Sequence, residues 1–238
     1  MKNNELFLHH HLGLGDHMDC NGMVRFLLET GDYNKINLFV KSTYHDMIKY
    51  MYSDEERINL VKINVDKDEH KQVFEYVRKS ENNNLLRVGH ENYPFGKEKI
   101  ENKNCWEYFY EQVKIPYNVK VDYFHIDRDQ KEEERIYNKL NPSNEPYAFI
   151  HDDPDKGHVL NTEHIENSDL KIIRNDPTEN VFHFLKILEQ AEEIHCMESC
   201  FKSLIEIYAK TDKLFYHDFR SHPLGKRTNK QWKVINYD

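Results

Sequence analysis

Short apolar runs alternate with amphipathic runs along this 238-residue chain, and that order restricts its fold more than any single motif. In the first part of the chain, apolar runs predict strands at residues 5–11, 36–40, 58–65 and 85–88. Apolar residues at helical spacing predict helices between them, at residues 17–30, 45–52 and 68–78. This βαβαβαβ order is typical of a parallel sheet, because parallel strands need long crossovers that are usually helical.

A second series of the same kind follows the Pro- and Asn-rich break at residues 141–146. An aromatic-rich helix at residues 106–110 and a charged helix at residues 130–140 precede it. Strands are predicted at residues 147–151, 170–173, 194–197 and 213–216, and helices at residues 180–191 and 200–208. The predicted fold class is therefore α/β, with two Rossmann-like halves, residues 1–120 and 121–238, facing a cleft. Ligands of such sheets bind outside the carboxyl ends of the strands.

Composition excludes several classes of function. The net charge of −9 disfavours general nucleic-acid binding, which normally uses a basic face. No apolar run approaches the roughly 18–20 residues that span a bilayer, so no transmembrane segment is expected. The N-terminus lacks the pattern of a signal peptide, and we expect a cytoplasmic protein, in the host cytoplasm if it is viral.

The four cysteines, at positions 20, 105, 196 and 200, form no CxxC pair and are too few for a disulfide framework. We expect reduced thiols. Cys196 and Cys200 could bind a metal ion, but no second ligand pair follows at zinc-site spacing. The spacing therefore favours the interpretation that the two are a buried structural pair. Consecutive residues of a strand face opposite ways, so His9, His10 and His11 are not expected to bind one ion together. No metal is predicted.

The first candidate site is Gly13-Leu14-Gly15-Asp16-His17, at a strand-to-helix turn. Its two glycines permit a positive φ and a close backbone approach, and the helix N-terminus suits an anion. The turn matches neither a complete dinucleotide-binding fingerprint nor a phosphate-binding loop with Gly-Lys-Ser/Thr. Asp16 has two interpretations, a helix N-cap or a general base at the mouth of the sheet.

Two further segments follow predicted strands in the second half. Residues 151–158 combine His151, Asp153 and Lys156 in a polar turn, which is either a charged loop or a site for hydrogen bonding and phosphate contact. Ser199 is a predicted N-cap for the helix at residues 200–208, and that helix N-terminus offers a second anion site. A basic cluster near the C-terminus either neutralises a diphosphate or forms a solvated face, and comprises Arg220, Lys226, Arg227 and Lys230.

The strand followed by Leu-Gly-Asp at the first helix resembles the amino-terminal signature of the heptosyltransferase-like glycosyltransferases of the GT-B fold. Residues 180–205, a helix, a short strand and another helix, resemble the donor-diphosphate element of the same enzymes. There the strand often ends in Asp-Ser or Asp-Thr, and here it ends in Glu198-Ser199. The likeness extends to small glycosyltransferases of viral or phage type.

This resemblance implies an inverting, metal-independent transfer of a sugar from a nucleotide-sugar donor to a hydroxyl of a glycan or other acceptor. Residues 1–120 would bind the acceptor, with Asp16 as base and a loop of Gly13, Gly15 and His17, and no cofactor is implied. The implied donor-binding residues, in the half at 121–238, are His151, Asp153, Lys156, Glu198, Ser199, Phe201 and Arg220. Two alternatives stay open, a non-catalytic nucleotide- or sugar-binding module and an Mg²⁺-dependent phosphohydrolase or kinase-like protein.

Overall fold

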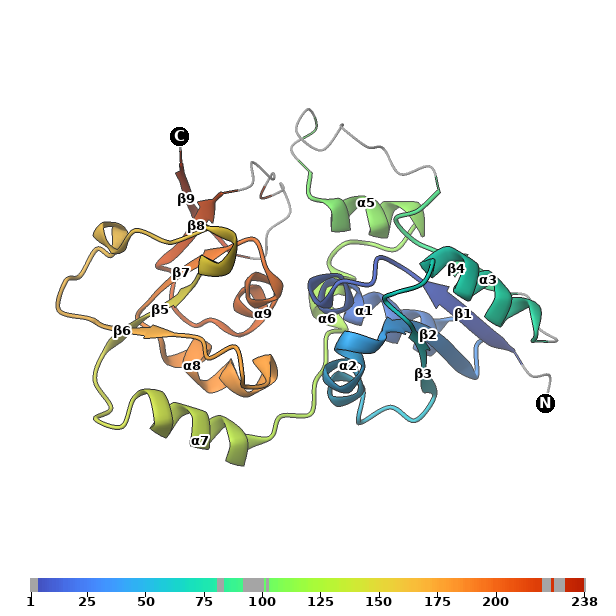
Figure 1. The fold of residues 1–238 in the computed structure, drawn as a ribbon, viewed down its shortest axis with the longest axis horizontal. Helices are drawn as coiled ribbons and strands as arrows, with labels where there is room; N and C mark the ends of the chain where they lie inside the picture. Colours follow the sequence, from blue (N-terminus) through green and yellow to red (C-terminus); the bar gives the residue numbers. More distant parts are fainter. Residues whose placement is uncertain are drawn as a thin grey trace. The chain divides into compact units, whose positions relative to one another are not determined.

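The computed structural model describes residues 4–80, 84–91, 101, 103–219, 224 and 230–237. The chain forms two compact units, which divide between Asp127 and Arg128 (Figure 1). We call the part up to Asp127 unit 1 and the part from Arg128 unit 2. Among the described residues, none of the helices combines the length and apolar character that crossing a membrane requires.

Unit 1 is built on a sheet with the strand order β3-β2-β1-β4, all parallel. Its strands are β1 (Glu5–His9), β2 (Lys35–Lys41), β3 (Ile58–Ile63) and β4 (Leu85–Arg87). Its described helices are α1 (Leu14–Thr30), α2 (His45–Met51), α3 (Glu69–Arg78), α5 (Cys105–Gln112) and α6 (Val119–Asp122), with a 3₁₀ turn at Ser42–Tyr44. The register places Leu8 of β1 between Leu38 of β2 and Leu86 of β4.

Helices cover both faces of this sheet, and its two central strands, β1 and β2, are buried along most of their length. Val73 and Val77 of α3 pack in one apolar cluster with Phe7 and Phe39. Residues that alternate with these in the strands point to the opposite face, which α1 covers (Figure 1). Near-continuous apolar strands are what such two-sided burial requires.

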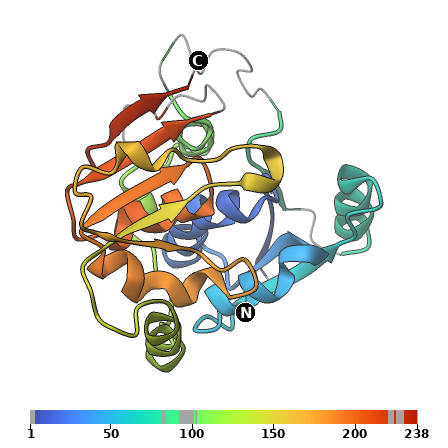
Figure 2. The ribbon, with the colours of Figure 1, turned by 60° about the vertical axis from the view of Figure 1, so that its left-hand side comes forward.

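Unit 2 repeats this plan with the strand order β6-β5-β7-β8-β9, again all parallel (Figure 2). Its strands are β5 (Tyr147–His151), β6 (Lys171–Arg174), β7 (Glu193–Met197), β8 (Leu214–Asp218) and β9 (Lys233–Asn236). Its described helices are α7 (Gln130–Leu140), α8 (Leu185–Gln190) and α9 (Cys200–Tyr208), with 3₁₀ turns at Pro154–Lys156, Thr162–His164 and Val181–Phe184.

These two sheets confirm the predicted α/β class with Rossmann-like halves, and the differences are local. Helix α1 begins at Leu14, three residues earlier than predicted, and strand β1 ends at His9. The helix predicted at residues 180–191 opens as a 3₁₀ turn, where Asn180 Oδ1 accepts a hydrogen bond from the Phe182 N–H at 3.0 Å. Strand β9 was not predicted, because it is four residues long and mostly exposed.

In each sheet the chain reverses its direction of strand addition once. In unit 1 the strands run from β1 outward to β3, and β4 then returns to the other side of β1. In unit 2 the corresponding point lies between β5 and β7. At such switch points the loops after two neighbouring strands diverge and leave room for a ligand at the carboxyl ends.

A hydrogen-bonded chain of four side chains crosses the interior of unit 2. His195 Nε2 donates to Glu193 Oε1 at 2.8 Å, and His195 Nδ1 lies 2.9 Å from His217 Nε2. His217 Nδ1 lies 2.7 Å from the Tyr237 hydroxyl. Glu193, His195 and His217 are fully buried. Burial and the neighbouring imidazoles of His195 and His164 lower the pKa of His217 to about 3.

This pKa makes unit 2 sensitive to acid. Above pH 6.5, His217 is neutral in both the folded and the unfolded chain, and its contribution to stability is complete. As the pH falls below 6.5, only the unfolded chain takes up the proton, so at pH 5 the free energy of unfolding drops by about 2 kcal/mol. Urea unfolding at pH 7 and pH 5 measures this loss, which His217→Gln should reduce.

His125→Gln is the matched control, because the His125 side chain is 55% exposed. It should keep the pH dependence of the wild-type chain. An unchanged pH dependence in His217→Gln would show that His217 is not the group responsible.

Candidate functional site

Asp16 lies at the switch point of the first sheet, in the first turn of α1. Gly13 is the N-cap of this helix, and Asp16 occupies the third helical position. Asp16 Oδ2 accepts a hydrogen bond from the Gly13 N–H at 3.2 Å, and Oδ1 accepts one from Trp106 Nε1 at 2.9 Å. The N-cap interpretation of Asp16 is therefore wrong in position, since the carboxylate instead reaches back to the cap residue in a capping box.

The two glycines of this turn do not adopt the predicted positive φ. Gly13 has φ −72°, which any residue can adopt, and Gly15 lies inside the first turn of α1. Among the described glycines, a positive φ occurs at Gly89 and Gly157. A Cβ on Gly13 would lie 2.7 Å from Asp16 Oδ2, so a larger residue at position 13 would displace this carboxylate.

Burial and hydrogen bonding act on the Asp16 carboxyl in opposite directions. Burial raises the pKa of the half-buried Asp16 carboxyl above its usual value, and the hydrogen bond from Trp106 opposes this shift. A carboxylate with a raised pKa is a stronger base than one in open water. Asp16 is thus a partly buried carboxyl with a raised pKa at the carboxyl edge of the first sheet.

His17, assigned to the same loop, turns into the interior instead. Its imidazole is fully buried, 4.4 Å from the ring of His10, and neither of its ring nitrogens has a hydrogen-bond partner among the described residues. Burial lowers the pKa of His17 well below its usual value and that of His10 to about 4. With no exposed surface, His17 cannot touch a phosphate in this conformation.

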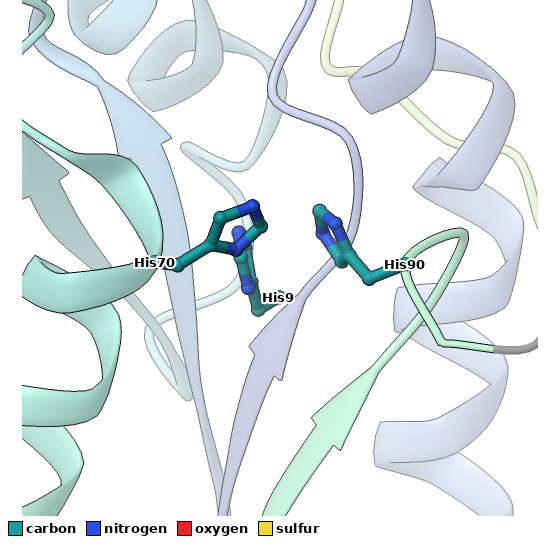
Figure 3. Close-up of side chains that lie close together, drawn as sticks. All are labelled: His9, His70 and His90. Atoms are coloured by element: carbon teal, nitrogen blue, oxygen red, sulfur yellow. The ribbon is translucent and has the colours of Figure 1, made fainter.

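Sequence analysis missed a cluster of side chains at this same edge. His70 and Glu69 at the start of α3, and Arg87 and His90 at the end of β4, gather around His9 of β1 (Figure 3). These residues are 60 or more positions from His9 in sequence, and no local motif links them. The pairing of β1 with β4 brings Arg87 opposite His9, and Glu69 and His70 reach His9 from α3.

The carboxyl edge of the second sheet brings together several of the predicted donor-binding residues. His151, at the end of β5, has its Nδ1 2.8 Å from Asn175 Oδ1 and its ring 4.5 Å from that of Phe201. Ser199 is the N-cap of α9, as predicted, and its Oγ accepts a hydrogen bond from the Phe201 N–H at 3.2 Å. The N-terminus of α9 and the aromatic ring of Phe201 therefore lie beside His151.

Glu198 adjoins this group and is paired. It accepts a hydrogen bond from the Tyr216 hydroxyl at 3.2 Å, and Lys202 Nζ lies 3.6 Å from its carboxylate. The Lys202 side chain is only 2% exposed, an unusual state for a lysine. Lys202 lies within residues 180–205, but its burial beside Glu198 is a tertiary feature.

The other predicted donor-binding residues form a loop with its own internal contacts. Lys156 Nζ binds the Asp153 carboxylate, and Asp153 also forms a backbone bridge with His158. The neighbouring Asp152 is buried and pairs with Arg174 at 2.6 Å. Lys156 is therefore paired with a carboxylate of the same loop, that of Asp153. Arg220, Lys226 and Arg227 lie outside the described residues, and Lys230 Nζ donates to the Ala209 carbonyl at 2.8 Å.

Solved structures of glycosyltransferases share this fold. The heptosyltransferase II of E. coli, an ADP-heptose lps heptosyltransferase, matches with a TM-score of 0.53 and 10% identity, covering 98% of this chain and 90% of that one. A family 9 glycosyl transferase from Veillonella parvula matches with a TM-score of 0.57 and 9% identity, covering 100% and 87%. The E. coli heptosyltransferase WaaC with ADP matches with a TM-score of 0.55 and 10% identity, covering 99% and 93%.

No family model and no curated protein matches the sequence. The similarity to these structures extends over both units at about 10% identity, and it therefore establishes the fold. The two parallel α/β units belong to the architecture predicted from the resemblance to the GT-B heptosyltransferases.

Proposed function

We propose that this protein is a glycosyltransferase that moves a sugar from a nucleotide-sugar donor to an acceptor hydroxyl, with inversion at the anomeric carbon. The observation that carries the proposal is Asp16, a half-buried carboxylate with a raised pKa at the switch point of unit 1, in a fold shared with heptosyltransferases. Unit 1 binds the acceptor, and unit 2 binds the donor.

In the proposed reaction, Asp16 accepts the proton of the acceptor hydroxyl as its oxygen attacks the anomeric carbon of the donor. The bond between that carbon and the diphosphate oxygen breaks, and the nucleoside diphosphate leaves with the bonding electrons. One C–O bond forms and one breaks, so the transfer needs no oxidant or reductant. The hydrogen bonds from Gly13 and Trp106 orient the Asp16 carboxylate for this step.

The leaving diphosphate gains negative charge, and groups placed to meet that charge accelerate the step most. In unit 2 the N-terminus of α9, capped by Ser199, supplies backbone donors and the positive end of a helix dipole. His151 and the Phe201 ring lie beside it and would contact the nucleotide. The proposed reaction requires no metal, because the α9 N-terminus, with His151 beside it, stabilises the negative charge of the leaving diphosphate.

A thermal-shift screen of nucleoside diphosphates and nucleotide sugars tests the donor assignment, starting with ADP, which one structural neighbour holds. We expect at least one nucleotide to raise the melting temperature, and Phe201→Ala to reduce that rise by loss of the ring contact. Binding without transfer or donor hydrolysis would identify a non-catalytic module. Phosphate release that depends on Mg²⁺ would identify a phosphohydrolase instead.

Replacement of Asp16 tests the base. Asp16→Asn and Asp16→Ala should keep the fold and donor binding but lower kcat by about 10²–10⁴-fold, the usual contribution of a positioned general base. Asp46→Asn is the matched control, because Asp46 is also in the first turn of a helix of unit 1 and its side chain is 98% exposed. Full activity in both Asp16 variants would refute the assignment.

Trp106 should tune this base without touching the reacting atoms. Its N–H favours the charged form of Asp16, so Trp106→Phe should raise the pKa of Asp16 further. Because the base must be ionised, the acidic limb of kcat/KM against pH should move to higher pH. The residual activity of Asp16→Asn should not respond to the second change. A limb that stays in place in Trp106→Phe would mean that Trp106 has only a structural part.

A further inference from the structure

We propose that unit 1 holds a divalent transition-metal site formed by His9, His70 and His90. This site lies outside the transfer chemistry described above and does not rest on it. One ring nitrogen from each of these histidines lies within 4.8 Å of the other two (Figure 3). The three come from β1, from the first turn of α3 and from the turn after β4, all at the carboxyl edge of the first sheet.

The hydrogen bonds around His9 assign its protons. Glu69 Oε1 lies 2.9 Å from His9 Nε2, and because a carboxylate oxygen accepts hydrogen bonds, Nε2 carries the hydrogen and donates. Arg87 is always charged and can only donate, and its Nε lies 3.4 Å from His9 Nδ1. His9 Nδ1 therefore presents a lone pair toward Arg87.

His70 presents a second lone pair to the same cation. Arg87 Nη2 donates to His70 Nδ1 at 2.8 Å. Two imidazole nitrogens thus face one positively charged group, which is the arrangement that a bound metal ion requires. Arg87 also pairs with Glu91, whose side chain is 63% exposed, so the guanidinium keeps an anionic partner when an ion takes its place.

His90 supplies the third ligand. Its Nε2 is buried and has no hydrogen-bond partner among the described residues, an arrangement that costs free energy unless something binds there. Its ring stacks on that of His9 with a centroid distance of 4.1 Å. Gly89, with φ +80°, makes the turn that carries His90 back over His9, and a Cβ there would lie 2.4 Å from the Phe109 ring.

The distances allow an ion after modest rotation of two rings. Bonds of about 2.0–2.1 Å to a tetrahedral ion bring ligand nitrogens to about 3.3 Å from one another. The exposed His70 and the half-buried His90 can rotate to meet this requirement, while the fully buried His9 stays in place. Glu69 behind His9 completes a carboxylate–histidine–metal arrangement, which fixes the ring and raises its basicity.

The donor set selects the class of ion. Three neutral imidazoles suit Zn²⁺, Co²⁺ or Ni²⁺, whereas Mg²⁺ and Ca²⁺ prefer oxygen ligands. The nearby Lys41 Nζ lies 3.5 Å from Glu69 Oε2 and offsets the negative charge of that carboxylate. This further disfavours a hard cation, which carboxylates would have to hold. We therefore expect binding of Zn²⁺ and Co²⁺ but not of Mg²⁺.

Calorimetric titration of the chelator-treated full chain with ZnCl₂ tests the site without donor or acceptor, so its outcome is independent of the proposed function. We expect one high-affinity ion for each chain, and with Co²⁺ the visible absorption of a tetrahedral nitrogen site. His70→Ala and His90→Ala should each weaken binding by about tenfold or more. His125→Ala removes an exposed histidine of unit 1 and should bind as the wild type does.

The Arg87→Met variant distinguishes binding at this site from non-specific binding to surface histidines. It removes the competing cation and keeps the three imidazoles, so the affinity for Zn²⁺ should rise about tenfold or more. Circular dichroism should show that the His70 and His90 variants remain folded. Equal affinity in the wild type and in a His70→Ala/His90→Ala double variant would overturn the proposal, as would weaker binding in Arg87→Met.

Discussion

The pairing of β1 with both β2 and β4 is the constraint on which unit 1 depends. A parallel strand buried on two faces must be apolar along its length, so polar groups gather where it ends. Because the sheet adds strands on both sides of β1, the carboxyl ends of β1 and β4 form the switch point. Asp16, the His9 cluster and the turn at Gly89 all lie at that edge.

Strand β1 ends within the histidine run, and His9 and His10 have different surroundings. His9 faces α3, where Glu69 and His70 meet it, and His10 faces α1, where it contacts His17. The steric rule that excludes one ion for His9, His10 and His11 together is therefore consistent with a metal site that uses His9 alone from the run. Its partners come from other segments, which the rule does not address.

Much of the site in unit 2 follows from local pattern. Ser199 as a helix cap and His151 at a strand end are short-range features, and the sequence suffices for both. The pairing of Lys156 with Asp153, the burial of Lys202 and the contact of His151 with Phe201 depend on how the loops fold over the sheet edge. The start of α1 was predicted three residues too late, because Gly13 and not Asp16 is its N-cap, and the Asp16 carboxylate accepts a hydrogen bond from the Gly13 N–H.

By itself the sequence determined the α/β class, the order of most strands and helices, and a strand-to-helix turn that contains Asp16. Apolar periodicity and glycine placement act over a few residues, and that is the range at which a single sequence can be interpreted. Only the tertiary structure decided that Arg87, His70 and His90 surround His9, and that His17 is buried. The contacts of His9 join segments 60 or more residues apart, and the pairing of β1 with β4 and the packing of α3 on the sheet, which no local pattern encodes, bring them together.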